Sequence, residues 1–443
     1  MPSSTTAICR SALSTGRTPR SIASKPGISR APCSPLSISC WRRHVARIRP
    51  SPSISGIRFR WPRSLKRSRR TGRRPSWRCR PHHEPGDLGI TMIVNQWVPA
   101  AHKGDAIGDS ARRVRTLLRE LGHESEIYAL TIDDELRGDV RWFADPAAKR
   151  GDLTIFHFAM VSPLTAEFAR LPGGRILQYH NVTPSHFFAA YDANIFRLTA
   201  LSREDLKTLV GHTDAALGDS EYNRRELESY GFTNTGVFPI AIDTERITAA
   251  PRRPALEAVL RTDGFLNFLF VGRIAPNKKI EDHIKLAEYY KRYVDESYRF
   301  IFVGRTDAVP RYFDTIQALL AEYRMPPGRF LFPGPVPDED LATYYRMSSV
   351  YISLSEHEGF CVPLLEAMAA DVPVLAYSST AVPDTLGGAG VQFAPKDLEY
   401  AAELLGELAY NDPLRAQVIS RQRARLNDFG DARIRRELER LTS

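Results

Sequence analysis

The sequence predicts an α/β protein: two Rossmann-like parallel-sheet domains facing a cleft, preceded by a disordered basic leader. Three observations lead to this fold class. From Met92 onward, short apolar runs alternate with amphipathic segments, which is the pattern of βα units. Two related lines, 268–273 and 300–305, each have the character of a buried strand that ends in Gly-Arg. Residues 1–91, in contrast, are rich in Ser, Arg and Pro and show no sustained period.

The basic character of the chain is confined to residues 1–91. Of the net charge of +10, this segment contributes +18, because it holds 20 Lys and Arg and only the acids Glu84 and Asp87, so the remaining residues carry −8. Such a segment has no apolar face to bury. It could be a basic arm for nucleic acid, an organelle transit peptide, or a stretch that is not native protein. We expect the last, with translation starting at Met92 and no nucleic-acid partner.

Cysteine usage and hydropathy restrict the cellular context. Only Cys361 lies outside the leader, which holds Cys9, Cys33, Cys40 and Cys79 without a C-x-x-C spacing. A single thiol after residue 91 excludes a disulfide framework there and fits a reducing compartment. No apolar run approaches the roughly 20 residues of a membrane helix. We expect a cytoplasmic protein, for which peripheral membrane association stays open.

The first domain is expected over residues 92–248. It opens with a strand at 92–98, a loop that contains Gly104, and a helix at about 109–121 that Gly122 ends. Four more strands are expected at 126–130, 153–157, 175–179 and 215–218.

Residues 245–264, with Pro251 and Pro254, have the character of a linker. A second α/β domain is expected over 262–425, followed by a C-terminal helix at 426–443. The two Gly-Arg lines are 32 residues apart, which suits strand, helix, strand. Later strands are expected at 330–332, 350–354 and 372–376. Because open parallel sheets bind ligands beyond the carboxyl ends of their strands, the cleft between the domains is the expected site.

Two cations follow the first Gly-Arg line. Arg273 comes directly after Gly272 at the end of a strand, and Lys278 follows five residues later in a loop that enters a helix. A planar guanidinium and a mobile ammonium at the mouth of a cleft suit a diphosphate. The competing interpretation is a pair of solvated surface cations.

A glycine loop that turns into a helix occupies residues 355–368. Pro363 suits the first helical turn, and the N–H groups before it point outward as an anion site: those of Gly359, Phe360, Cys361 and Val362. Glu358 stands just before this site. Glu366 lies about one turn into the helix, where a carboxylate accepts hydrogen bonds from ribose hydroxyls, worth roughly 1.5–3 kcal/mol each. The alternative is two surface glutamates beside an ordinary helix start.

Together these motifs resemble the retaining family 4 glycosyltransferases of the GT-B fold. Gly-Arg-x4-Lys at 272–278 is followed by Glu-Gly-Phe-x-x-Pro-x-x-Glu-Ala at 358–367, and the likeness continues through 369–374 and 384–390. Ser-Glu-Tyr-Asn at 220–223 resembles the end of the family's first domain. The resemblance covers nearly all of 92–430 and none of the leader.

The resemblance implies transfer of a hexose from a nucleotide diphosphate sugar to a glycan, lipid-linked or small acceptor, with retention of configuration. It implies no metal and no cofactor. Arg273 and Lys278 would hold the donor diphosphate, and Glu366 would hold the ribose. Glu358, with the amides of Gly359 and Phe360, would hold the hydroxyls of the transferred sugar. The expected donor site is completed by Gly104, Gly272, Cys361 and Val362.

His180 matches the family histidine that faces the transferred sugar, although a lone histidine is more often structural, and His157 and His186 compete for the role. Other residues depart from the family pattern or are better explained by a structural role. Asp105 would repel a phosphate if its side chain turned inward. Cys361 replaces a family glycine and is expected to be a packing residue. The acids at 338–340 are expected to cap a helix rather than bind a metal.

Two other functions stay open: a nucleotide-sugar epimerase of the same architecture, and a non-catalytic nucleotide-sugar-binding module. The loops at 304–310 and 332–337, which would contact the base, do not specify it. GDP-mannose and UDP-glucose are favoured as donors only because they are common donors, and no residue of this sequence selects them.

Overall fold

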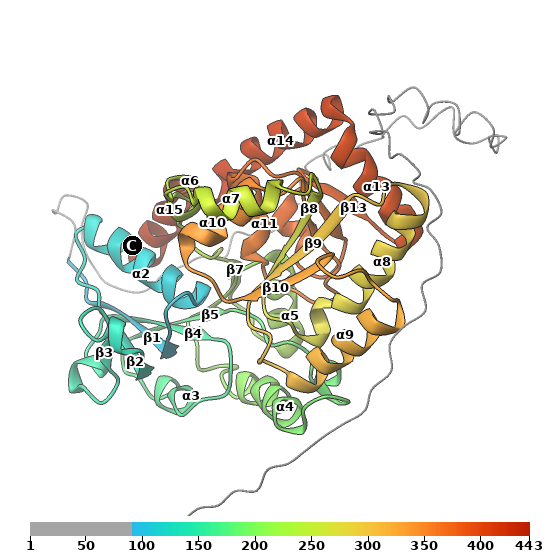
Figure 1. Cartoon of the computed structure of the whole chain (residues 1–443). Coiled ribbons are helices and arrows are strands. Elements are labelled where there is room, and N and C mark those ends of the chain that lie inside the picture. The colour runs from blue at the N-terminus through green and yellow to red at the C-terminus, as the bar shows by residue number, and fades with distance from the viewer. Residues whose placement is uncertain (1–90) are drawn as a thin grey trace, which may run out of the picture. The chain divides into compact units, whose positions relative to one another are not determined.

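The computed structural model describes residues 91–443, and the expectations made for residues 1–90 lie outside this range. Within it, the chain forms two parallel sheets, each flanked by helices (Figure 1). The predicted fold class, two Rossmann-like parallel-sheet domains, is confirmed.

The first sheet has seven strands in the order β3-β2-β1-β4-β5-β6-β7, and all its pairings are parallel. Its strands are β1 (Val94–Ala101), β2 (Ile127–Ile132), β3 (Arg141–Trp142), β4 (Leu153–Phe158), β5 (Gly174–Tyr179), β6 (Ala215–Gly218) and β7 (Thr235–Val237). The elements that connect them are α2 (Ala106–Glu120), η1 (Asp134–Leu136), η2 (Pro146–Lys149), α3 (Leu164–Phe168), η3 (Ser185–Phe188), α4 (Ala193–Lys207) and α5 (Glu221–Tyr230).

The second sheet has six parallel strands in the order β10-β9-β8-β11-β12-β13. Its strands are β8 (Leu266–Val271), β9 (Tyr298–Val303), β10 (Phe330–Gly334), β11 (Val350–Ser353), β12 (Val374–Tyr377) and β13 (Val391–Phe393). The elements around it are α6 (Glu245–Thr248), α7 (Pro254–Arg261), η4 (Pro276–Lys278), α8 (Ile280–Tyr293), α9 (Pro310–Glu322), α10 (Asp338–Arg346), α11 (Val362–Ala369), α12 (Val382–Leu386), α13 (Leu398–Tyr410) and α14 (Asp412–Leu426).

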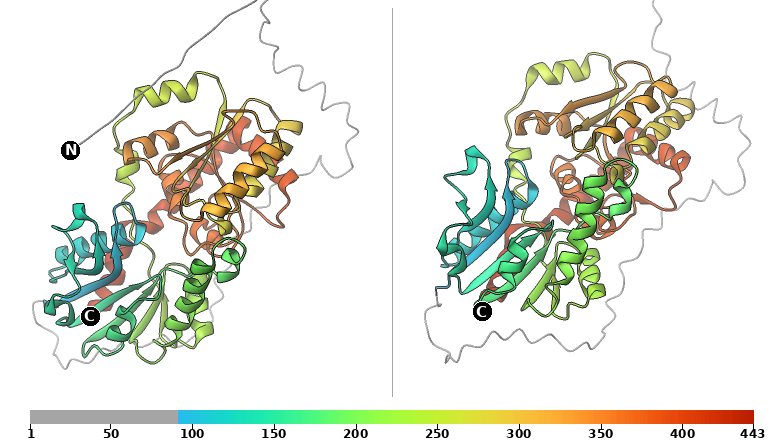
Figure 2. Two further views of the ribbon diagram at one scale, coloured as in Figure 1. Left: turned by 60° about the horizontal axis from the view of Figure 1, so that its bottom comes forward. Right: turned by 90° about the horizontal axis from the view of Figure 1, so that it is seen from below.

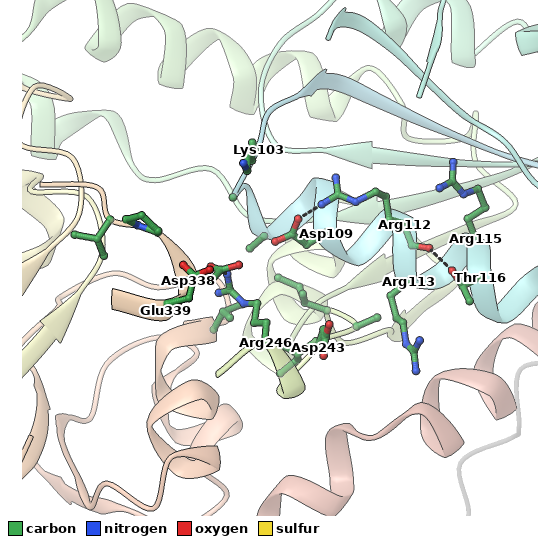
Figure 3. Close-up of a pocket in the computed structure, with 18 residues that line it drawn as sticks. Lys103, Asp109, Arg112, Arg113, Arg115, Thr116, Asp243, Arg246, Asp338 and Glu339 are labelled. Carbon is green, nitrogen blue, oxygen red and sulfur yellow. Dashed lines mark hydrogen bonds and ion pairs between the residues drawn. The ribbon is translucent and has the colours of Figure 1, made fainter. Parts of the chain in front are cut away.

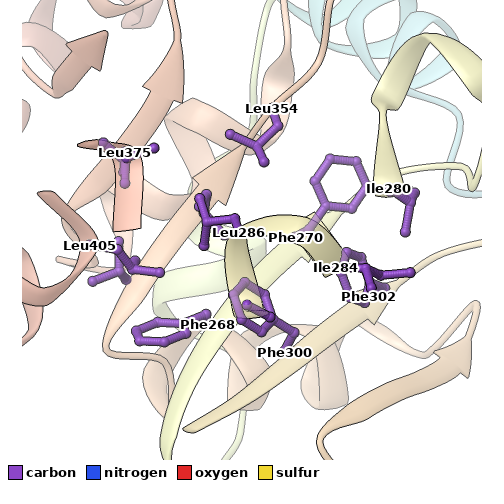
Figure 4. Close-up of a cluster of buried hydrophobic side chains, with 14 of the residues drawn as sticks. Phe268, Phe270, Ile280, Ile284, Leu286, Phe300, Phe302, Leu354, Leu375 and Leu405 are labelled. Atoms are coloured by element: carbon purple, nitrogen blue, oxygen red, sulfur yellow. The ribbon is translucent and has the colours of Figure 1, made fainter. Parts of the chain in front are cut away.

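The two Gly-Arg lines form β8 and β9, which are neighbouring inner strands of the second sheet. Alternate residues of a strand face opposite sides, so Phe268 and Phe300 pack with α8 and α13 on one face (Figure 4). Leu269 and Ile301 pack with α10 and α11 on the other. Both faces are therefore covered, which explains why residues 268–271 and 300–303 are apolar at every position rather than at every second one.

The expected linker at 245–264 is not an unstructured connection. It holds α6 and α7, with Pro254 at the first turn of α7. Ile247 and Leu260 are buried in the core on the α10 and α11 side of the second sheet. Pro254 therefore marks a helix start, because a proline in the first helical turn loses no hydrogen bond, and Pro251 lies between the two helices.

The last helix, α15 (Asp431–Thr442), packs beside α2 of the first domain. Ile434 and Leu438 are buried with Val114 and Leu117 of α2, and in both views of Figure 2 the C-terminus lies at the first sheet. The chain therefore joins the two domains twice, once before α6 and once between α14 and α15.

Candidate functional site

The glycines of the two Gly-Arg lines lie against each other at the carboxyl ends of β8 and β9. Gly272 and Gly304 have φ values of 152° and 140°, and a Cβ on Gly304 would lie 2.2 Å from the carbonyl oxygen of Gly272. This close approach explains why both strands end in glycine. The two arginines then differ. Arg305 pairs with Asp307, whereas Arg273 is exposed and makes no ion pair or hydrogen bond with any residue from 91 to 443.

Lys278 and Glu358 form a nearly buried ion pair. The Nζ of Lys278 lies 2.7 Å from each carboxylate oxygen of Glu358, and the two side chains are 16% and 7% exposed. Thr380 donates to the carbonyl of Glu358 and accepts from its N–H, which holds the loop in place. Removing one member of such a pair leaves an uncompensated charge at a cost of about 3–5 kcal/mol, so each residue needs the other or a ligand.

Glu366 has its own partners. One oxygen of its buried carboxylate contacts the guanidinium of Arg246, and the other accepts a hydrogen bond of 2.7 Å from the hydroxyl of Tyr345. Burial, and then the charge of Glu366, raise the pKa of Tyr345 well above its usual value, so this hydroxyl stays a donor. Glu358 and Glu366 are therefore neutralised separately, which excludes a shared-proton pair of carboxylates.

The start of α11 carries unpartnered backbone donors. Among residues 91–443, the N–H groups of Gly359, Phe360, Cys361 and Val362 find no acceptor. Cys361 is the N-cap, with a left-handed φ of 70°, and Pro363 occupies the first turn as expected. Burial raises the pKa of the Cys361 thiol well above its usual value, with the Glu358 charge adding to the effect. The thiol therefore packs in the core rather than acting as a nucleophile.

A cavity of about 920 Å³ lies between the first domain and the second (Figure 3). Gly104 and Lys103 line it from the β1–α2 loop, and Val336, Val362 and Arg246 line it from the opposite side. Of the predicted donor residues, Gly104 and Val362 thus meet at this cavity, with the Arg246–Glu366 pair at its wall.

The acids around this cavity have structural roles. Asp105 caps α2 by accepting from the N–H of Gly108 at 3.1 Å, so its carboxylate is turned to the helix and α2 begins earlier than expected. The acids at 338–340 do not cap α10, contrary to expectation, because its N-cap is Pro337. They occupy the first turn instead, where Asp338 pairs with Arg246 and Asp340 with Arg253.

The sugar-loop residues, defined here as 356–360, touch the first domain directly. The hydroxyl of Ser220 donates to the carbonyl of Gly359 at 2.8 Å, and His357 Nε2 lies 2.7 Å from Asn181 Oδ1. Burial lowers the pKa of His357 to about 3, so its ring is neutral and donates to the amide oxygen. Nearby, the N–H of Tyr222 donates to Asp384 at 2.8 Å.

The ring of His180 is buried inside the first domain, with a side-chain exposure of 1%. Its Nδ1 lies 2.9 Å from Asp219 Oδ2, and its Nε2 lies 2.9 Å from His157 Nδ1. Both ring nitrogens are therefore occupied, so the ring offers no free nitrogen to a sugar. The backbone of His180 does reach the cleft, because its carbonyl oxygen lies close to Gly359.

The structure thus pairs Lys278 with Glu358 just before the start of α11 and Glu366 with Arg246. Arg273 is exposed after the end of β8, and Gly104 lies across the cavity. Sequence reasoning missed Arg246 and Tyr345. Arg246 lies in the expected linker, and Tyr345 lies in the helix that follows the acids at 338–340, and no motif marks either residue. No group of three or more His, Cys, Asp or Glu in residues 91–443 is arranged to hold a metal ion. Over the same residues, no helix is long and apolar enough to cross a membrane.

Comparison with known proteins points to one family. Residues 255–425 match the family described as "Glycosyl transferases group 1". The O-antigen chain mannosyltransferase B of Escherichia coli is 27% identical over 161 residues, which are 36% of this chain and 41% of that protein. A GDP-mannose-dependent alpha-mannosyltransferase of Mycobacterium tuberculosis is 27% identical over 163 residues, 37% and 39% of the two chains. The chain thus matches about two fifths of the length of these relatives.

Solved structures show the same fold across both domains. Anabaena HepE in complex with UDP and glucose superposes with a TM-score of 0.62 at 13% identity, over 79% of this chain and 99% of that one. WaaG, a glycosyltransferase involved in lipopolysaccharide biosynthesis, gives a TM-score of 0.60 at 14% identity, over 79% and 100%. Residues 255–425 are therefore similar to the glycosyl transferases group 1, and the two sheets have the GT-B fold.

Proposed function

We propose that this protein transfers a mannosyl residue from GDP-mannose to a glycan or lipid-linked acceptor, with retention of anomeric configuration and without a metal ion. The family supports the transfer, and relatives that are mannosyltransferases, some of them GDP-mannose-dependent by name, support the donor. UDP-glucose is the competing donor, because a fold neighbour has been solved with it.

One observation carries the proposal: four unpartnered N–H groups at the start of α11 stand beside the Lys278–Glu358 pair. Buried or half-buried donors without acceptors are uncommon unless a ligand satisfies them. A helix N-terminus favours an anion, and Lys278 and the unpaired Arg273 add two positive charges. A diphosphate matches this set, since it has several oxygens and needs more than one cation.

Glu358 then has a different task from a general base. Lys278 faces both of its carboxylate oxygens, so a donor that draws Lys278 to its phosphate frees Glu358 to accept from sugar hydroxyls. Arg273 and Lys278 would stabilise the negative charge that develops on the departing GDP, which is the charge that must be stabilised for the glycosidic bond to break. The side chain of Glu366 would accept from the ribose of the donor.

The test compares variants of Arg273 and Glu358 with a variant of an arginine outside the predicted site. Arg273→Ala and Glu358→Gln should each lower mannosyl transfer from GDP-mannose by on the order of a hundredfold or more. Arg292→Ala is the control, because Arg292 lies on α8 and pairs with Glu288 of the same helix. Near-normal rates for both site variants would refute the assignment.

The same assay distinguishes the other functions. An epimerase would convert the donor sugar with no acceptor present, and a binding module would bind GDP-mannose without turnover. Thermal stabilisation by GDP, UDP and their sugars identifies the base, because a ligand of the folded state at about 100 times its Kd adds about 2.7 kcal/mol. NMR of the first product formed shows whether the anomeric configuration is retained.

A further inference from the structure

Four polar side chains form a continuous chain across four neighbouring strands of the first sheet. Gln96 lies in β1, His157 in β4, His180 directly after β5 and Asp219 directly after β6. Gln96 Oε1 lies 3.0 Å from His157 Nε2, His157 Nδ1 lies 2.9 Å from His180 Nε2, and His180 Nδ1 lies 2.9 Å from Asp219 Oδ2. None of the four side chains is more than 1% exposed.

Both ends of this chain are oxygen acceptors. Gln96 donates its Nε2 to the carbonyl of Ala111 at 3.0 Å, which leaves Oε1 to face His157. Turning the amide over would place two oxygens against each other at Ala111. At the far end, the second oxygen of Asp219 accepts from Gln178 Nε2 at 3.2 Å. The orientation of both terminal groups is therefore determined by partners outside the chain.

The number of protons in the chain follows from these fixed ends. Three hydrogen bonds need one proton each. Two neutral imidazoles supply only two. The third belongs to the Asp219 end, where a carboxylate beside an imidazolium forms the stronger, charge-assisted bond. His180 is thus protonated on both nitrogens, and His157 is neutral with its proton on Nε2.

The surroundings agree with this assignment. Burial, and then the charge of His180, lower the pKa of His157 well below its usual value. Gln178 is the other polar group that bonds to Asp219 from a neighbouring strand. Tyr179 points to the opposite face, where it bonds to Glu226 and so lies outside the network. No other ionised side chain among residues 91–443 bonds to the two rings.

The network ends where the first domain meets the second. His180 immediately precedes Asn181, which bonds to His357, and Asp219 immediately precedes Ser220, which bonds to Gly359. We propose that Gln96, His157, His180 and Asp219 form a relay holding one extra proton, which positions the strand ends of the first domain against the sugar loop. His180 is then a positioning residue that acts through its backbone and through Asn181. Only the kinetic consequence rests on the proposed function.

The first test reads the proton directly. In the full chain labelled with ¹⁵N-histidine, one histidine should show two protonated ring nitrogens at a pH at which exposed histidines are neutral. His180→Gln identifies that signal by removing it. Finding all histidines neutral at this pH would overturn the proposal.

The second test asks whether the two ends of the hydrogen-bonded network, Gln96 and Asp219, are energetically coupled. Asp219→Asn can turn its amide nitrogen toward His180 Nδ1, so two neutral imidazoles complete the network and the extra proton is no longer needed. Gln96→Met removes the acceptor at the other end, which leaves two hydrogen bonds for two protons. Because both changes remove the same proton, their effects on stability should not add, although two rings separate the residues. We expect a coupling on the order of tenfold in the unfolding equilibrium constant, as within a connected network. Asp214→Asn, at the other end of β6 and bonded to the backbone of Arg175, should show none.

The third measurement is kinetic. Asp219→Asn and Gln96→Met should each lower kcat for mannosyl transfer with little change in the affinity for GDP. Additive effects on stability overturn the relay. Intact coupling with unchanged kcat overturns its positioning role. A protein that couples as expected but transfers no sugar, even unmutated, refutes the proposed function instead and leaves the relay standing.

Discussion

Adding a single methyl group at Gly359 should lower activity without preventing folding. Its φ lies outside the left-handed region, so alanine fits the backbone. An added Cβ would, however, lie 2.5 Å from the Cβ of Asn181 and 3.1 Å from the carbonyl oxygen of His180. Both neighbours belong to the first domain, so Gly359→Ala pushes the sugar loop and the strand ends apart.

The size of the effect follows from these distances. Carbon atoms in contact prefer about 3.5–4.0 Å, so the two segments must separate by about 1 Å. Neither neighbouring atom is the end of a flexible side chain. Overpacking of this kind costs about 1–3 kcal/mol of stability. A misplacement of about 1 Å in a catalytic site lowers rates about a hundredfold. We therefore expect a folded protein that is about a hundredfold slower.

The assay is mannosyl transfer from GDP-mannose, measured together with unfolding in denaturant. Gly138→Ala is the control, because a Cβ there meets nothing within 4 Å and the residue needs no special backbone conformation. It should leave both rate and stability near those of the unmodified protein.

A rescue variant sharpens the test. Asn181 has a φ of 70°, which glycine adopts readily, so Asn181→Gly removes the opposing Cβ without backbone strain. Added to Gly359→Ala, it should recover part of the lost rate, although it also removes the bond to His357. A Gly359→Ala protein with a normal rate, or one that Asn181→Gly slows further, would refute the steric reasoning.

Three further outcomes are expected. Arg246→Ala should lower the free energy of unfolding by about 3–5 kcal/mol because it leaves Glu366 buried and unpaired, and adding Glu366→Gln should restore part of the loss. Burial lowers the pKa of His283 to about 4 and that of His357 to about 3. In the unfolded chain these rings take up protons near pH 6.5, whereas in the folded protein they stay neutral to lower pH. The free energy of unfolding is therefore highest above about pH 6.5, and each ring lowers it by up to about 1.4 kcal/mol per pH unit as the pH falls toward 4. His283→Gln should reduce this slope by one proton, and an unchanged slope would contradict the assignment. Excess chelator should leave the transfer rate unchanged, and restoration of a lost rate by a divalent cation would contradict metal independence.

The sequence determined the fold class and most of its strands. Apolar runs such as 268–271 and 300–303 are buried on both faces, so every position carries a strong signal. The short strands β3, β7 and β13 were not predicted, because two or three residues at a sheet edge have no pattern to detect. Helices α6 and α7 were mistaken for a linker because proline usually breaks a helix, whereas here Pro254 starts α7 and Pro251 lies between the two helices.

Some features of the candidate site could be predicted from the sequence, and others depend on the tertiary structure. Arg273, Lys278, Glu358 and the start of α11 are adjacent to strand ends, and the carboxyl ends of parallel strands meet at one edge whatever the details of packing. The pairing of Glu366 with Arg246, 120 residues away, and the burial of His180 against Asp219, 39 residues away, depend on how elements dock. Local pattern determines which groups reach the edge of a sheet, and only tertiary packing decides which of them find partners inside the protein and which stay free for a ligand.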